Sequence, residues 1–262
     1  MSTTWIIILG ISITFIANTL GCSLVYVFKK KINPKINSCV LGFASGIMIS
    51  ASVFGLIMPA IEQSKGIGDW FFLPASIGLL MGCLLFELID KFVPHIHKAD
   101  MNEEGPKNKL SKSMKLFFAV LIHNIPEGLA VGIVFGNAIA SGQMSAYISA
   151  LGISIGVAIQ NFPEGIAVSM PIKQETGNNN KAFFLGTVSG IVEPIFAIIA
   201  LLISTKIHNL MPWLLAIAAG AMIFVTIEDL IPDAKLSSKS HIGSWSFIIG
   251  FVVMMILDIA LA

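Results

Sequence analysis

Long apolar runs separated by short polar connections dominate the sequence. Eight runs approach the roughly 20 residues that a helix needs to cross the hydrocarbon core of a bilayer. The longest connection, residues 91–113, is polar and charged. The pattern predicts an all-α integral membrane protein whose single transmembrane domain occupies residues 1–262. The expected spans cover about residues 5–28, 38–61, 70–90, 114–137, 145–170, 182–205, 211–231 and 242–261.

The composition supports a membrane location. Hydrophobic residues make up 55% of the chain and charged residues 12%, whereas a soluble domain is about one-quarter charged. The net charge of +1 and the lack of a basic region argue against nucleic acid as a partner. The three cysteines lie in apolar surroundings without C-x-x-C spacing, so neither a disulfide framework nor a thiolate metal site is expected. No basic segment or cleavage site marks the first run as a removable signal peptide.

The positions of the lysines predict the orientation. The chain has no arginine, and all of its 16 lysines except Lys65 and Lys206 lie at the end of the first, third, fifth or seventh span or in the connection after it. The positive-inside rule therefore places the 91–113 loop in the cytoplasm. Both termini are expected outside a cell membrane that the chain crosses several times, in agreement with an even number of spans.

Three carboxylates fall at membrane depth. Glu127, Glu164 and Glu193 lie near the midpoints of the fourth, fifth and sixth spans, and no lysine lies at this depth. A charged side chain at the bilayer centre costs at least about 2.5–3.5 kcal/mol on insertion scales and marks a functional site by default. Such carboxylates either take up a proton or hold a bound cation.

A repeated motif favours the bound cation. H-N-I-P-E-G at residues 123–128 returns as Q-N-F-P-E-G at residues 160–165, and the three- and four-residue spacings put its polar side chains on one helix face. The fourth and fifth spans run in opposite directions, so the copies are expected to meet at the midplane, as in transporters with inverted repeats. Imidazole, carboxylate and amide oxygen suit Zn²⁺, Fe²⁺, Mn²⁺, Co²⁺ or Cd²⁺. The candidate ligands are His123, Asn124, Glu127, Gln160, Asn161, Glu164 and Glu193.

Further acidic residues lie near the ends of the spans. Glu62 and Asp258 are expected at the outer ends of the second and eighth spans, and Asp90, Glu228 and Asp229 at the inner ends of the third and seventh. Carboxylates at several depths are typical of an ion path rather than of one structural ion. Because water reaches helix ends, a solvated role for these five stays open.

The paired motifs and Glu193 resemble those of the ZIP (Zrt/Irt-like) metal transporters, particularly the bacterial GufA-like branch. The resemblance covers the whole chain. It includes A-S-G-I-M-I-S-A-S at residues 44–52, F-E-L-I-D-K-F-V-P-H at residues 86–95 and A-A-G-A-M-I-F-V-T-I-E-D-L-I-P at residues 218–232. It implies uptake of divalent metal, zinc foremost, into the cytoplasm.

The resemblance also implies a binuclear metal centre midway across the membrane. Asn161 and Gln160 stand where some relatives carry aspartate and histidine. The resemblance further implies a release site near Asp90, Glu228 and Asp229, an entrance near Glu62 and Asp258, and sliding of spans one, four, five and six against the rest. The first ion would bind His123, Glu127, Gln160 and Glu164, and the second Asn124, Glu127, Asn161, Glu164 and Glu193.

Other functions fit the sequence less well. A proton- or sodium-coupled exchanger of another cation is the main alternative, although His123 is a poor ligand for a hard ion such as Ca²⁺. An intramembrane metalloenzyme lacks an H-E-x-x-H signature, so no enzymatic activity or cofactor is expected. His95 and His97 could capture metal, but a solvated loop is favoured. The expected partners are the lipid bilayer and the metal ions, and a homodimer is left open.

Overall fold

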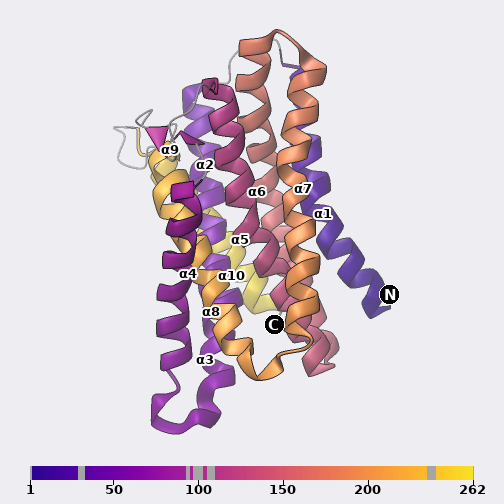
Figure 1. The fold of residues 1–262 in the computed structure, drawn as a ribbon, viewed down its shortest axis with the longest axis vertical. Coiled ribbons are helices and arrows are strands. Elements are labelled where there is room, and N and C mark those ends of the chain that lie inside the picture. The colour runs from indigo at the N-terminus through magenta and orange to yellow at the C-terminus, as the bar shows by residue number, and fades with distance from the viewer. Residues whose placement is uncertain are drawn as a thin grey trace.

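The computed structural model describes residues 2–28, 33–92, 95–96, 103–104, 110–234 and 240–261. Long helices lie side by side along most of the molecule (Figure 1). They are α1 Thr3–Ser23, α2 Pro34–Ser50, α4 Leu73–Phe92, α5 Lys112–Ser141, α6 Met144–Thr176, α7 Asn179–Ser204, α8 Met211–Val225 and α10 Ile242–Leu261.

Shorter elements connect or extend these helices. The turns of 3₁₀-helix are Leu24–Tyr26, Lys65–Trp70 and His208–Leu210, and the short α-helices are α3 Met58–Ser64 and α9 Ile231–Ala234. Strands β1 (His95–Ile96) and β2 (Glu103–Glu104) pair antiparallel, with His95 opposite Glu104.

Seven helical stretches of the described chain are long and apolar enough to cross a membrane. The apolar part of α4, Leu73–Ile89, falls short of that length, so the count of eight spans stays a prediction. Outward faces are apolar: α7 exposes Ile191, Ile195, Ile198 and Leu202, spaced to form one stripe. Such a surface suits contact with lipid, as expected for a multi-pass membrane protein.

The helices are irregular at places that the sequence did not indicate. Pro126 lies inside α5, and Pro163 inside α6, without ending either helix. The winding changes instead after α2 and after α8, where Ala51–Ile57 and Thr226–Leu230 form π-helical segments. Such segments are rare and frequently lie at functional sites.

The long helices form two groups. α1 packs mainly on α6 and α5 mainly on α7, and these four are named the first helix group. α2 packs mainly on α10 and α4 mainly on α8, and α8 also packs on Ala51–Ile57 and α3, which continue α2, so α2, α4, α8 and α10 are named the second helix group. Within each group, glycines let the backbones approach closely: a Cβ at Gly21 of α1 would lie 1.9 Å from the Phe162 carbonyl oxygen of α6. Contacts between the groups are less extensive.

Candidate metal centre

Seven polar side chains meet inside the first helix group. They come from α5, α6 and α7, and every one of them is buried. The four-residue spacing within each motif puts its first and fifth residues on one helix face, directed between α5 and α6. These are the residues that the sequence singled out: His123, Asn124, Glu127, Gln160, Asn161, Glu164 and Glu193.

One histidine and two glutamates are arranged around a common point. His123 Nε2 lies 3.7 Å from Glu127 Oε1 and 3.9 Å from Glu164 Oε1. The ligand atoms of these three side chains all lie within 4.8 Å of one another. Ligands about 2.1 Å from a shared tetrahedral zinc ion lie about 3.4 Å apart, so a small contraction would complete a zinc site.

The amide side chains direct their nitrogens toward protein acceptors. Gln160 Nε2 donates to Glu127 Oε1 at 2.7 Å, and Asn124 Nδ2 donates to the Ser189 carbonyl oxygen at 3.0 Å. Asn161 Nδ2 donates to Glu193 Oε2 and, at 3.5 Å, to the carbonyl oxygen of Thr14 on α1. These bonds fix which end of each amide is the oxygen.

Several ligand-type atoms in the same space have no hydrogen-bond partner. A buried polar atom without a partner costs about 1–3 kcal/mol, and more if it is charged. A divalent cation would remove that cost by accepting their lone pairs, so the donor set fits a metal cargo. The atoms are His123 Nε2, Asn124 Oδ1, Glu127 Oε2, Gln160 Oε1, Asn161 Oδ1 and Glu193 Oε1.

Asp229 brings the second helix group to the centre. Its Oδ2 lies 3.6 Å from His123 Nδ1, and it belongs to the π-helical segment after α8. The sequence placed Asp229 with Asp90 and Glu228 at an inner release site, but the structure places it beside the central histidine. Glu228 is exposed, and the side chains of Asp90, His95 and His97 lie outside the described part of the chain.

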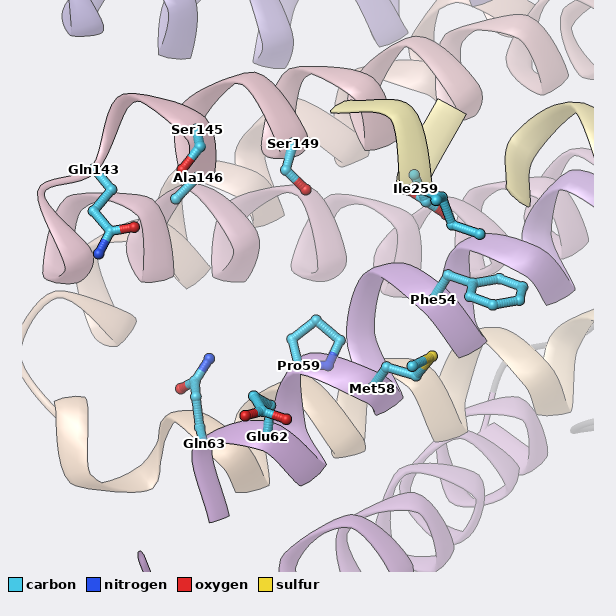
Figure 2. Close-up of a pocket in the computed structure, with 11 residues that line it drawn as sticks. Phe54, Met58, Pro59, Glu62, Gln63, Gln143, Ser145, Ala146, Ser149 and Ile259 are labelled. Carbon is cyan, nitrogen blue, oxygen red and sulfur yellow. The ribbon is translucent and has the colours of Figure 1, made fainter. Parts of the chain in front are cut away.

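The predicted entrance residues line one pocket. Glu62 of α3 and Asp258 of α10 border a cavity of about 610 Å³. Asp258 is 5% exposed and neither of its carboxylate oxygens has a hydrogen-bond partner, whereas exposed Glu62 pairs with Lys65. Figure 2 shows Glu62 and Gln63 on one side of this pocket and Gln143 and Ser149 on the other.

Sequence reasoning missed the residues that support the centre through their backbone. The carbonyl groups of Thr14 and Ser189 accept the asparagine amides, and a carbonyl acceptor leaves no signal in the side-chain pattern. Gln143 and Ser149, which line the pocket, were missed as well. Uncharged polar residues near the start of a helix are common, so the sequence gives no reason to single them out. A polar residue inside an apolar run, such as Thr14, was the one available sign.

Several known proteins are similar in sequence to this chain. A family model described as ZIP zinc transporter matches residues 3–116 and 111–258. Human zinc transporter ZIP11 is 31% identical, covering 97% of this chain and 96% of the relative. Zinc transporter ZupT of Clostridium perfringens is 34% identical over 87% of both chains. Zinc transporter GufA of Myxococcus xanthus is 30% identical, covering 84% of this chain and 85% of the relative.

Proposed function

Since this chain belongs to the ZIP zinc transporter family and transports divalent metal cations, we propose that its buried centre holds two ions on their way into the cytoplasm. The observation that carries the proposal is the convergence of buried, unpartnered ligand atoms between α5, α6 and α7. One ion would bind His123, Glu127, Gln160 and Glu164. The second would bind Asn124, Asn161 and Glu193 together with the same two glutamates.

The two positions would differ in chemistry. The first has an imidazole, which zinc accepts readily, and the second has only oxygen ligands. Zinc is therefore the expected cargo of the first position, with Fe²⁺, Mn²⁺, Co²⁺ and Cd²⁺ as further substrates. Glu127 and Glu164 would bridge both positions, so that loss of either carboxylate affects both ions.

The path would begin at the pocket that Glu62 and Asp258 share. Asp258 offers two unpartnered oxygens in a buried setting, and such a group attracts a cation that leaves water. Asp229 would receive the ion directly from the centre, because its carboxylate already lies beside His123. The inward direction follows from the resemblance to the family, and the lysines favour a cytoplasmic position for the loop before α5, away from this pocket.

Movement would occur between the two helix groups. A Cβ at Gly128 of α5 would lie 2.3 Å from the Glu193 carbonyl oxygen, a rigid contact within the first helix group. Between the groups, a Cβ at Gly156 of α6 would meet the flexible side chain of Met254 on α10. A backbone contact of this kind within the first helix group, and an adaptable side-chain contact between the groups, favour sliding of α1, α5, α6 and α7 as a unit.

An eight-span topology completes the proposal. α4 has 20 residues, Leu73–Phe92, and at 1.5 Å per residue it reaches about 30 Å, the thickness of the hydrocarbon core. With α4 counted, the chain crosses the membrane an even number of times. Both termini would then lie on the same side, which the lysines indicate is the outside.

Zinc uptake into proteoliposomes tests the proposed function. The wild-type protein should admit zinc to an internal fluorescent indicator, and Glu164→Gln should lower the rate at least about 100-fold, because a neutral amide replaces a bridging carboxylate. Ser204→Ala is the matched control: Ser204 is buried in the same helix group, but its hydroxyl bonds Leu201 of its own helix. Near wild-type uptake by Glu164→Gln at equal reconstitution would contradict the proposal.

A further inference from the structure

The contact between α5 and α7 has two features beside the metal centre. Asn124 Nδ2 donates to the Ser189 carbonyl oxygen at 3.0 Å. Four residues further along α7, the backbone of Glu193 packs against Gly128, which directly follows the motif residue Glu127. A Cβ at Gly128 would lie 2.3 Å from the Glu193 carbonyl oxygen.

The contact between α6 and α1 has the same two features. Asn161 Nδ2 donates to the Thr14 carbonyl oxygen at 3.5 Å. Four residues further along α1, the backbone of Asn18 packs against Gly165, where a Cβ would lie 2.2 Å from the Asn18 carbonyl oxygen. Gly165 directly follows the motif residue Glu164. Asn18 on α1 therefore stands where Glu193 stands on α7.

The side chain of Asn18 has a different direction from that of Glu193. Glu193 extends to the centre, where it accepts the Asn161 amide. Asn18, only 1% exposed, instead donates through Nδ2 to the Gly186 carbonyl oxygen of α7 at 3.1 Å. It fills the space between two glycines, since a Cβ at Gly165 would lie 3.0 Å from its Oδ1 and one at Gly190 would lie 2.2 Å from its Nδ2.

We infer that Asn18 is a positioning residue of the metal centre, which fixes the separation between α6 and α7. This inference rests on the proposed function. Gly165 adjoins Glu164, and Gly190 lies one helical turn before Glu193, so the width of the Asn18 side chain sets the distance between two proposed ligands. Partners of metal ligands that hold them in place typically change metal affinity roughly 10–100-fold when they are replaced.

The test replaces the amide of Asn18 in two ways. Asn18→Leu keeps a similar shape but cannot donate to the Gly186 carbonyl oxygen. Asn18→Ser is smaller, so it cannot overpack, and its hydroxyl is too short to span the same distance. Ser204→Ala again serves as the control for loss of a buried polar group. Two quantities are measured for each variant: the half-saturating zinc concentration for uptake, and the melting temperature with and without zinc.

The inference predicts at least about a 10-fold rise in half-saturating zinc for both Asn18 variants. It also predicts a smaller zinc-induced rise in melting temperature, since that rise follows the affinity. Ser204→Ala should keep its half-saturating zinc concentration within about twofold of wild type. Its zinc-induced rise in melting temperature should match that of the wild-type protein. If the Asn18 variants melt earlier without zinc but keep a wild-type response to it, Asn18 supports only the fold and the inference is wrong. Absence of zinc uptake by the wild-type protein would instead overturn the proposed function.

Discussion

The polar side chains of the centre differ in what they offer a divalent cation. His123 presents an unpartnered Nε2, while Gln160, at the matching place in the second motif, presents Oε1 and donates its amide to Glu127. An amide oxygen is a harder and weaker ligand for zinc than an imidazole nitrogen. The two motifs thus contribute unequally to the first ion position.

Replacing Gln160 by histidine should shift the selectivity. Gln160→His adds a second imidazole and removes the donor that occupies Glu127, so affinity for Zn²⁺ should rise relative to Mn²⁺. We expect the ratio of the half-saturating Mn²⁺ concentration to the half-saturating Zn²⁺ concentration to rise about 10-fold. Tighter binding also slows release, which lowers the maximal rate of zinc uptake. Uptake and binding are compared at fixed pH, because protons compete with metal for histidine. An unchanged ratio would mean that Gln160 does not contact the ion.

Asp258 is expected to affect uptake mainly at low zinc concentration, where binding at the entrance limits the rate. Asp258→Asn keeps the shape of the pocket but removes its buried charge, so the half-saturating zinc concentration should rise several-fold, about 3–10-fold, while the maximal rate changes little. Asp69→Asn, an exposed residue outside the pocket, is the control. Equal kinetics for the two variants would exclude Asp258 from the entrance.

At this scale the central residues can be singled out from the sequence alone. Their charge at membrane depth and their repeated spacing identify them without a structure, because lipid penalises such residues unless they have a function. The contact between His123 and Asp229 could not be predicted in the same way. It depends on the winding of the segment after α8 and on how two distant helices pack.

Among the elements, the long helices follow from hydrophobic length alone. The predicted span 242–261 coincides with α10, and residues 114–137 and 145–170 lie inside α5 and α6. The π-helical segments Ala51–Ile57 and Thr226–Leu230 were not predicted. A local change from i→i+4 to i→i+5 hydrogen bonding does not alter the pattern of a continuously apolar sequence. Beyond the meeting of α5 and α6 that the repeated motif predicts, the pattern of apolar residues does not predict which helices pair, since every apolar face is compatible with lipid as well as with protein.

The two kinds of helix contact should differ in their tolerance of a methyl group. At Gly82 of α4, a Cβ would lie 2.0 Å from the carbonyl oxygen of Ile217 on α8, so Gly82→Ala must displace a backbone. At Gly156 the Met254 side chain can move aside. Gly82→Ala should cost about 1–3 kcal/mol of stability, and Gly156→Ala less. Thermal unfolding in detergent measures both, and a larger loss for Gly156→Ala would contradict the division into two helix groups.

For the whole molecule, orientation is the main expectation from the lysines. In a variant without Cys22, Cys39 and Cys83, a cysteine introduced by Lys65→Cys should react with a membrane-impermeant reagent in intact cells. One introduced by Asn179→Cys should react only after the membrane is opened. Both sites are exposed or partly exposed at helix ends. The reverse labelling pattern would invert the topology and with it the proposed direction of transport.

The most direct test of the metal centre is the location of bound zinc by anomalous diffraction at the zinc edge. Crystals grown with zinc should show one peak about 2.0–2.2 Å from His123 Nε2 and from carboxylate oxygens of Glu127 and Glu164. A second peak is expected among Asn124, Asn161 and Glu193. Zinc peaks confined to the Glu62 and Asp258 pocket, with none between α5, α6 and α7, in a preparation that takes up zinc, would contradict the account.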